Sequence, residues 1–416
     1  MSAVSVEETS EALPGTSVSS PVSSTVSAVR RTYDAGRTRP LAWRREQLQG
    51  LIRMLADREA EFSAALAADL GKNPLEGYLT ELSITRSEAE YALKHLPQWT
   101  RSTKVPVPLG LQPASAKTEP QPLGVVLIIA PWNYPVQLLL APLIGALAAG
   151  NAAVLKPSEL APATSRVIAA LLPQYLDPDA VVVVEGGQEA STALLAERFD
   201  HIFFTGGERV GRVVLQAAAR YLTPVTLELG GKSPAVVLDG NFTAIARRLL
   251  YGKLLNAGQT CVAPDYVLVT EAAAPKLRKA LVKELAGLFG KDPAKSADLG
   301  RIINAQHWDR LHGLLDSGTV LAGGRGDRDS LYLEPTILTE VAPDSAVMQE
   351  EIFGPILPVL TVKDLDEAMA FINARPVPLA SYLYTQSAPA RQAFEAGVRA
   401  GSVNHNVSTV QLLSLI

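Results

Sequence analysis

The sequence predicts an α/β fold made of two α/β units in tandem. From residue 125 onward, short apolar runs alternate with helical stretches, which is the pattern of βαβ units around a parallel sheet. The runs are continuously apolar instead of alternating, as expected of strands that are covered on both faces. A chain of 416 residues with 47% hydrophobic and 19% charged residues can fill such cores, and its length predicts two to three domains of about 150 residues.

The N-terminal region is predicted to be a tail followed by two helical regions. Residues 1–28 are rich in Ser, Thr and Val and contain no Lys or Arg, so we expect a disordered tail and no secretory signal. Residues 40–70 carry apolar positions at helical spacing, and Gly71 ends that run. A second helical region is expected at about 76–99.

The stretch between Glu119 and Lys156 contains no charged residue and could be mistaken for a membrane span. Prolines and glycines interrupt it, so it divides better into a buried strand at 125–130 and an apolar helix at 136–149. We therefore expect no membrane span.

Two series of strands follow from the apolar runs. The first comprises residues 125–130, 152–155, 181–184, 202–204 and 224–229. The second comprises residues 235–238, 266–270, 355–362 and 381–384, with helices that include 274–288 and 365–372. A proline-rich segment at 108–123 precedes both series, and its prolines favour edge or protruding strands.

Composition excludes several classes of function. The 38 basic and 42 acidic residues give a net charge of −4, so nothing points to nucleic acid or to an anionic membrane. A single cysteine excludes an intramolecular disulfide and a multi-cysteine metal site, and the five scattered histidines have no ligand spacing. We expect no metal and a reducing, cytoplasmic location.

Two loops at predicted strand ends could hold a dinucleotide. Gly206 and Gly207 separate a strand from a helix whose free N–H groups could face a phosphate, although the spacing is not G-x-G-x-x-G and a plain turn is the alternative. Lys156 and Glu159 follow a buried strand, where open α/β sheets bind ligands. Glu159 could accept from ribose hydroxyls, and a solvated loop with a helix cap is the alternative.

Cys261 is a candidate nucleophile. It lies between Gly258 and Pro264, which favour a shaped loop. A lone cysteine is more often a small buried hydrophobic residue, so the sequence around it leaves both roles open.

Glu228 and Asn133 are the other catalytic candidates. Glu228 ends an apolar strand before two glycines and could act as a general base, or it could form an ion pair with Lys232. Asn133 lies between Pro131 and Pro135, where its amide could donate to an oxyanion or could tolerate a tight turn.

Six motifs, in order, resemble the aldehyde dehydrogenase superfamily. They are PWNYP, KPSE, FFTGG-x-x-VG, LELGGKSP, GQTC and EEIFGP, and the resemblance extends from about residue 29 to about 405. The chain looks most similar to the class 3 branch, which acts on fatty and aromatic aldehydes.

The resemblance implies oxidation of an aldehyde to a carboxylic acid through a cysteine thiohemiacetal and a thioester. Cys261 matches the family nucleophile, Asn133 matches the oxyanion donor acting with the backbone N–H of Cys261, and Glu228 matches the base that activates water. The implied cofactor is NAD, with NADP possible, and Glu159 near the 2′-hydroxyl favours NAD. The residues that match cofactor-binding positions are Lys156, Glu159, Gly206, Gly207, Val210, Gly211, Glu351 and Phe353.

The resemblance also implies an organisation. The NAD-binding domain would be Rossmann-like and comprise residues 29–107 and 124–232, and an oligomerisation β-hairpin would occupy 108–123. The α/β catalytic domain would comprise residues 233–416, and the family implies a homodimer.

Two departures from the family pattern keep alternatives open. Many relatives have Ser where this chain has Gly207. The family also continues past Val403-Asn404 through a Phe-Gly-Gly loop and a closing strand, whereas this sequence continues as HNVSTVQLLSLI to Ile416 and leaves the C-terminal end of the catalytic domain incomplete. One alternative is therefore a non-catalytic or weakly active nucleotide-binding remnant, and another is a CoA-acylating relative, which a water-activating Glu228 disfavours.

Overall fold

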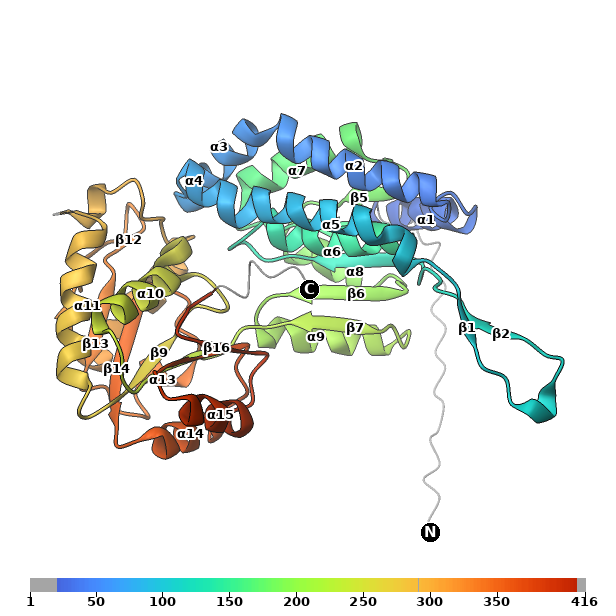
Figure 1. Ribbon diagram of the computed structural model, residues 1–416. Coiled ribbons are helices and arrows are strands. Elements are labelled where there is room, and N and C mark those ends of the chain that lie inside the picture. Colours follow the sequence, from blue (N-terminus) through green and yellow to red (C-terminus); the bar gives the residue numbers. More distant parts are fainter. Residues whose placement is uncertain (1–20, 291, 410–416) are drawn as a thin grey trace, which may run out of the picture.

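The computed structural model describes residues 21–290 and 292–409 and contains two α/β units side by side (Figure 1). The first unit is built on a five-stranded parallel sheet with the order β5-β4-β3-β6-β7. Its strands are β3 (Val125–Ile129), β4 (Ala152–Lys156), β5 (Val181–Val183), β6 (His201–Thr205) and β7 (Val225–Glu228). All five strands of the first predicted series are confirmed, and we call this sheet the first sheet.

The second unit is built on a seven-stranded sheet, here called the second sheet, with the order β10-β13-β14-β9-β8-β15-β16. Its strands are parallel except β10, which runs antiparallel to β13. The strands are β8 (Pro234–Val237), β9 (Tyr266–Thr270), β10 (Thr319–Ala322), β13 (Thr336–Thr339), β14 (Ile356–Val362), β15 (Ala380–Tyr384) and β16 (Ser402–His405). A two-stranded ribbon, β11 (Gly326–Asp327) with β12 (Tyr332–Leu333), lies outside it.

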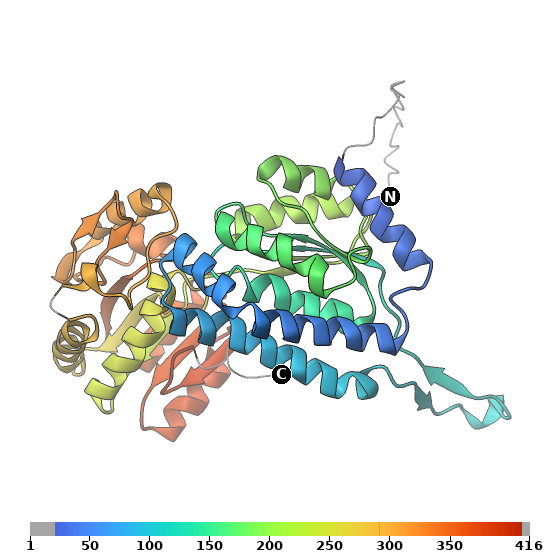
Figure 2. The same ribbon diagram turned by 90° about the horizontal axis from the view of Figure 1, so that it is seen from above.

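Helices pack around both sheets, which explains why the strands are apolar throughout (Figure 2). Those of the first unit are α1 (Pro21–Asp34), α2 (Leu41–Asp57), α3 (Glu59–Leu70), α4 (Pro74–Gly77), α5 (Ile84–Trp99), α6 (Gln137–Ala149), α7 (Pro162–Tyr175), α8 (Gln188–Leu195) and α9 (Glu208–Ala219). Those of the second unit are α10 (Phe242–Leu254), α11 (Ala274–Leu288), α12 (Ala305–Gly313), α13 (Ala346–Gln349), α14 (Leu365–Asn373) and α15 (Ala388–Gly397). Over the described residues, no helix combines the length and the apolar character that crossing a bilayer requires.

The predicted disordered tail is wrong at its C-terminal end. Residues 1–20 lie outside the described residues, but Pro21 begins α1, so 21–28 are helical. The reason is an apolar stripe within the Ser- and Thr-rich segment, because Val26 and Val29 are buried at 3% and 1% exposure against the first core. Arg30 of the same helix forms an ion pair with Asp200 at 2.8 Å.

The two predicted N-terminal helical regions are present but divided. The run over 40–70 forms α2 and α3, which are separated by Arg58 in a non-helical conformation, and Gly71 ends α3 with φ of +64°. The region after it contains α4, a π-helical segment (Tyr78–Ser83) and α5. Single π-helical turns within α-helices are rare and occur frequently at functional sites.

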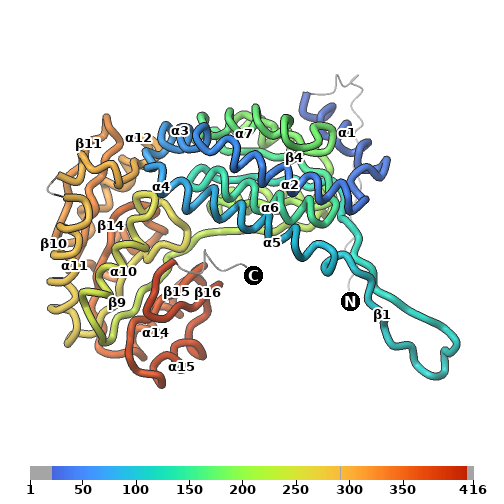
Figure 3. The backbone as a smooth tube through the Cα atoms, turned by 45° about the horizontal axis from the view of Figure 1, so that its top comes forward, coloured from blue at the N-terminus to red at the C-terminus, as the bar shows by residue number. Residues whose placement is uncertain are grey.

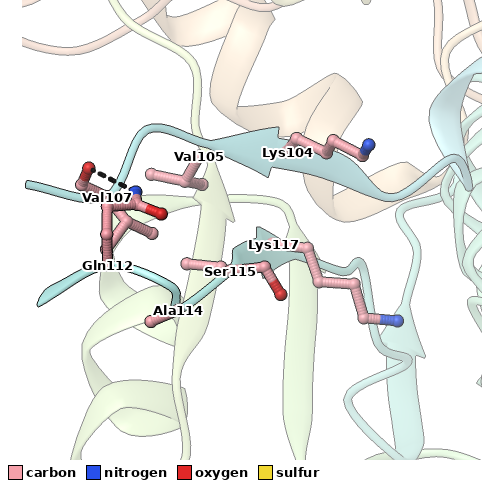
Figure 4. A pocket seen from close by; sticks show the side chains of 8 residues that line it. Lys104, Val105, Val107, Gln112, Ala114, Ser115 and Lys117 are labelled. Atoms are coloured by element: carbon pink, nitrogen blue, oxygen red, sulfur yellow. Dashed lines mark hydrogen bonds between the residues drawn. The ribbon is translucent and has the colours of Figure 1, made fainter. Parts of the chain in front are cut away.

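The predicted hairpin is present, but the predicted bounds 108–123 lie about five residues C-terminal to the observed ones. Strands β1 (Thr103–Val105) and β2 (Ala116–Thr118) pair antiparallel, so the hairpin spans 103–118 and its prolines lie in the connecting turn. The hairpin projects from the body of the molecule (Figure 3). A hollow between the two strands of the hairpin is lined by residues that include Lys104 and Lys117 (Figure 4). Beside it, Gln112 Nε2 donates to the backbone carbonyl of Val107 at 3.3 Å.

Candidate active site

The predicted site residues lie at or beside the ends of strands in the two sheets. In the first sheet they follow the carboxyl ends of strands: Asn133 comes after β3, Lys156 ends β4, Gly206 follows β6, and Glu228 ends β7. In the second sheet the order is reversed, since Cys261 precedes β9 and Glu351 precedes β14. The carboxyl edge of one parallel sheet, where open α/β sheets bind ligands, therefore faces loops at the amino edge of the other (Figure 1).

The loop that carries Cys261 is tightly constrained. A 3-10 segment (Leu255–Gly258) leads into it, and Asn256 and Ala257 both have φ of +52°, a left-handed conformation that is costly for residues other than glycine. The buried side chain of Gln259 compensates by bonding to three backbone groups: its Nε2 donates to the carbonyl of Asn256 at 2.9 Å and to that of Arg301 at 3.0 Å, and its Oε1 accepts from the N–H of Ile303 at 3.0 Å. Cys261 itself is only partly buried.

Asn133 lies directly beside this loop. Its side chain is 2% exposed, and its Nδ2 donates to the backbone carbonyl of Gln259 at 3.0 Å. This bond fixes the orientation of the amide, because exchanging its oxygen and nitrogen would place two oxygens against each other. An amide nitrogen carries two hydrogens, so the second hydrogen remains for a ligand oxygen.

Desolvation of the sulfur and two acidic neighbours raise the pKa of the Cys261 thiol, although the residue as a whole is partly exposed. Burial is the main cause that raises the pKa of its thiol from 9.0 to about 12, and the charges of Glu351 and Glu228 act in the same direction. The backbone N–H groups of Cys261 and Val262 oppose this effect. Both carboxylates therefore lie within electrostatic reach of the sulfur, which groups three of the predicted site residues.

Glu351 is partly buried, and its carboxylate packs against a pair of glycines. A Cβ on Gly230 would lie 2.1 Å from its Oε2, so a larger residue there would displace the carboxylate, and the N–H of Gly231 donates to that carboxylate. Burial raises the pKa of Glu351 to about 8, assisted by the negative charge of Asp265. The carboxyl of Glu351 is therefore harder to ionise than that of an ordinary glutamate.

Asp265 and Lys232, to which the sequence assigned no part in the site, fix the loop of Glu351. Lys232 Nζ donates to Asp265 at 2.5 Å and to the carbonyls of Val347 and Glu350, both at 2.8 Å. The other oxygen of Asp265 accepts from the backbone N–H of Ile352 at 2.9 Å. The alternative ion pair between Lys232 and Glu228 is therefore not formed, and the Glu228 side chain is exposed at the strand end.

The predicted cofactor residues form a cradle at the first sheet. Gly207 is the N-cap of α9, and a Cβ there would meet nothing within 4 Å, which leaves open space above the first free N–H groups of the helix. Val210 in the first turn of that helix is 42% exposed. Lys156 is buried at 2% and donates to Glu159 at 3.3 Å. These features fit a dinucleotide, whose pyrophosphate needs close backbone approach and whose ribose needs an acceptor.

The two remaining cofactor-binding candidates are Gly211 and Phe353, which lie in different parts of the site. Gly211 packs in α9, where a Cβ would lie 3.2 Å from Leu229. Phe353 has φ of +51°, and its ring stands edge-on to Trp132 at 5.3 Å between centroids. Among the described residues, no group of three His, Cys, Asp or Glu side chains could hold a metal ion.

Comparison with known proteins identifies the family of the chain. The family model described as "Aldehyde dehydrogenase family" matches residues 14–414. "Aldehyde dehydrogenase family 3 member H1" of Arabidopsis thaliana is 48% identical over 400 residues, 95% of this chain and 83% of the relative. This relative confirms the predicted likeness to the class 3 branch.

Solved structures give the same answer. "Substrate bound state of Staphylococcus Aureus AldH" superposes with a TM-score of 0.93 at 44% identity, covering 95% of this chain and 87% of the other. "NAD+ complex structure of aldehyde dehydrogenase from bacillus cereus" superposes with a TM-score of 0.86 at 27% identity, covering 93% and 81%. The chain therefore belongs to the aldehyde dehydrogenase family, whose members oxidise aldehydes to carboxylic acids with NAD or NADP as the hydride acceptor.

Proposed function

We propose that Cys261 is the nucleophile of this oxidation and that Asn133 stabilises the oxyanion that its attack creates. Loss of its proton to water gives the thiolate of Cys261, which adds to the aldehyde carbon and passes its negative charge to the carbonyl oxygen. The free hydrogen of Asn133 Nδ2 and the backbone N–H of Cys261 then donate to that oxygen. The observation that supports the proposal is the bond from Asn133 Nδ2 to the backbone carbonyl of Gln259, a residue that lies two positions before Cys261 in the chain.

A bound NAD would supply the hydride acceptor that conversion of the thiohemiacetal into a thioester on Cys261 requires. Glu351 and Phe353 would hold the nicotinamide end, Lys156 and Glu159 the adenosine ribose, and Gly206 and Gly207 the pyrophosphate. Val210 and Gly211 would line the turn beside them. Glu159 disfavours a 2′-phosphate by charge repulsion, so we propose NAD over NADP.

Glu228 is the proposed base for release of the acid. It takes a proton from water, the hydroxide adds to the thioester carbon, and cleavage of the carbon–sulfur bond frees the carboxylic acid and the thiolate. Its exposed side chain and its electrostatic influence on Cys261 support this role over that of a structural ion pair. A hydrolytic base also favours an acid product over CoA acylation, and the alternative of a non-catalytic remnant finds no support in the relatives or in this geometry.

The experiment follows NADH formation with one aliphatic and one aromatic aldehyde. Cys261→Ala should abolish turnover, because the sequence contains no other thiol. Glu228→Gln should give about one NADH per site in a rapid phase and then a slow steady state, since deacylation becomes limiting. Retained turnover in Cys261→Ala would refute the nucleophile, and loss of the rapid phase in Glu228→Gln would place that residue in the first step instead.

The organisation of the chain is part of the same proposal. We assign residues 29–102 and 119–232, on either side of the hairpin, to cofactor binding and residues from 233 onward to catalysis, with the hairpin joining two copies as a homodimer. Leu109 at the hairpin tip is 89% exposed and Leu111 is 65% exposed, which supports a contact with a partner. A cytoplasmic location fits the single free cysteine, and fatty or aromatic aldehydes are the proposed substrates.

A further inference from the structure

A fully buried ion pair lies behind the predicted oxyanion donor. Lys72 Nζ and Glu81 Oε1 are 2.6 Å apart, and both side chains have 0% exposure. Lys72 follows Gly71 at the end of α3, and Glu81 lies in the π-helical segment. Neither residue contacts Cys261, and burying two charges is costly unless the remaining bonding groups are used.

The remaining bonds of the pair converge on the loop after β3. Glu81 Oε2 accepts from the backbone N–H groups of Val136 and Gln137 at 2.9 and 3.0 Å, at the N-terminus of α6. A carboxylate at this position satisfies free N–H groups and interacts favourably with the helix dipole. Lys72 Nζ donates to the backbone carbonyl of Asn133 at 2.9 Å. The pair therefore fixes both ends of residues 133–137.

The same pair also constrains the neighbour of the nucleophile. Lys72 Nζ lies 4.0 Å from the centre of the Tyr134 ring, in cation–π geometry. The hydroxyl of Tyr134 is bonded to Thr260 Oγ1 at 2.6 Å, and Thr260 precedes Cys261 in the chain. A displacement of the ion pair would therefore move the amide of Asn133 relative to the sulfur.

We propose that Lys72 and Glu81 are positioning residues that hold the amide of Asn133 where the oxyanion forms. The inference rests on the proposed function, because it assigns a purpose to the pair through the role of Asn133. Misplacing a reacting group by ~1 Å can reduce a rate on the order of 100-fold. Since the oxyanion exists only in the transition state and the intermediate, the loss should appear in kcat more than in KM.

Three variants and two substrates test the inference. Glu81→Gln, Lys72→Met and the uncharged double variant are assayed with an aldehyde and with a 4-nitrophenyl ester, which acylates the thiol through an oxyanion without hydride transfer. Alkylation of Cys261 by iodoacetamide provides the internal reference, because that substitution creates no oxyanion. We expect kcat for both substrates to fall ~10- to 100-fold, with alkylation rates within about twofold of the unsubstituted protein.

Asp200→Asn is the matched control. Asp200 also forms an ion pair, with Arg30, and also accepts a backbone N–H, that of Val125 at 2.8 Å, but at the opposite end of β3. Its substitution should change stability without changing kcat for either substrate. An equal loss of kcat in this control would show that any weakening of the sheet is sufficient, and it would overturn the inference.

A double-mutant cycle decides whether the pair acts through Asn133. In an Asn133→Ala background, Glu81→Gln should lower kcat by no more than about twofold, because the side-chain amide that the ion pair positions is absent. A full multiplicative loss in that background, unchanged kcat in the double variant, or failure of all three variants to fold would overturn the inference. Loss of activity in Cys261→Ala with full activity in Glu81→Gln would leave the proposed function intact and reject only this pair.

Discussion

The thiol of Cys261 should react slowly until the pH is well above neutral. The structure raises its pKa from 9.0 to about 12, so its thiolate fraction at pH 8 should be roughly 1,000-fold below that of an ordinary cysteine. A more basic thiolate is also more nucleophilic, with a Brønsted slope of ~0.4–0.5, which offsets roughly 16- to 32-fold of that deficit. The net expectation is alkylation about 30- to 60-fold slower than for an unperturbed thiol.

Iodoacetamide labelling between pH 7 and 10 measures this directly. Cys261 is the only cysteine of the sequence, so each adduct detected by mass spectrometry reports this sulfur alone, and the urea-unfolded chain supplies the unperturbed reference. The native rate should rise about tenfold per pH unit through pH 10, because a thiol far below its pKa gains thiolate in that proportion. A plateau below pH 9, or a native rate equal to the unfolded rate at pH 8, would refute the reasoning.

One substitution tests the electrostatic part of the same expectation. The carboxyl of Glu351 has its pKa raised to about 8, so it acquires charge above that pH and disfavours the thiolate of Cys261. Glu351→Gln should therefore speed alkylation above pH 8 and leave it nearly unchanged at pH 7. An effect of equal size at both pH values would assign the slow reaction to steric exclusion instead.

Three further outcomes follow from single contacts. Gly258→Ala should destabilise the protein by about 2 kcal/mol or more and abolish turnover, since its φ is +78° and a Cβ would lie 2.2 Å from the carbonyl of Gly354; an unchanged urea midpoint would contradict this. Glu159→Gln should lower KM for NADP by roughly tenfold relative to NAD, because a carboxylate near the 2′-position is removed, and steady-state kinetics with an unchanged ratio would remove Glu159 from cofactor selection. Asp69→Ala should cost about 1 kcal/mol in thermal or urea unfolding, because its carboxylate accepts two N–H groups at the start of α7, and kcat should not change.

The strands of the first sheet were predictable because burial on both faces makes them uniformly apolar. Val125 and Val154, for example, are fully buried. The edge strands β10 and β16 were not predicted, since they are short and partly exposed and therefore lack the continuous apolar signal. The division of 40–70 at Arg58 was missed for a different reason, because the apolar spacing continues across the break.

The candidate site shows the same limit. The motifs identify residues such as Cys261 and Glu351 because each has a local context of glycines and prolines. The residues that hold the site loops in place have no neighbouring motif that identifies them. Lys72 lies 61 residues before the carbonyl to which it donates, and Asp265 lies 87 residues before the residue whose N–H it accepts. Only the three-dimensional fold brings these groups together, so no spacing along the sequence could reveal them.

The glycine contact between the two loops of the second sheet has a mechanical consequence. At Gly258 the backbone leaves no room for even a methyl group against the carbonyl of Gly354. The segment of the nucleophile and the segment of Glu351 are thus in direct backbone contact, with no compressible side chain between them. A movement of one segment toward the other would have to displace its neighbour, so a substitution that shifts the Glu351 segment is expected to shift the Cys261 loop as well.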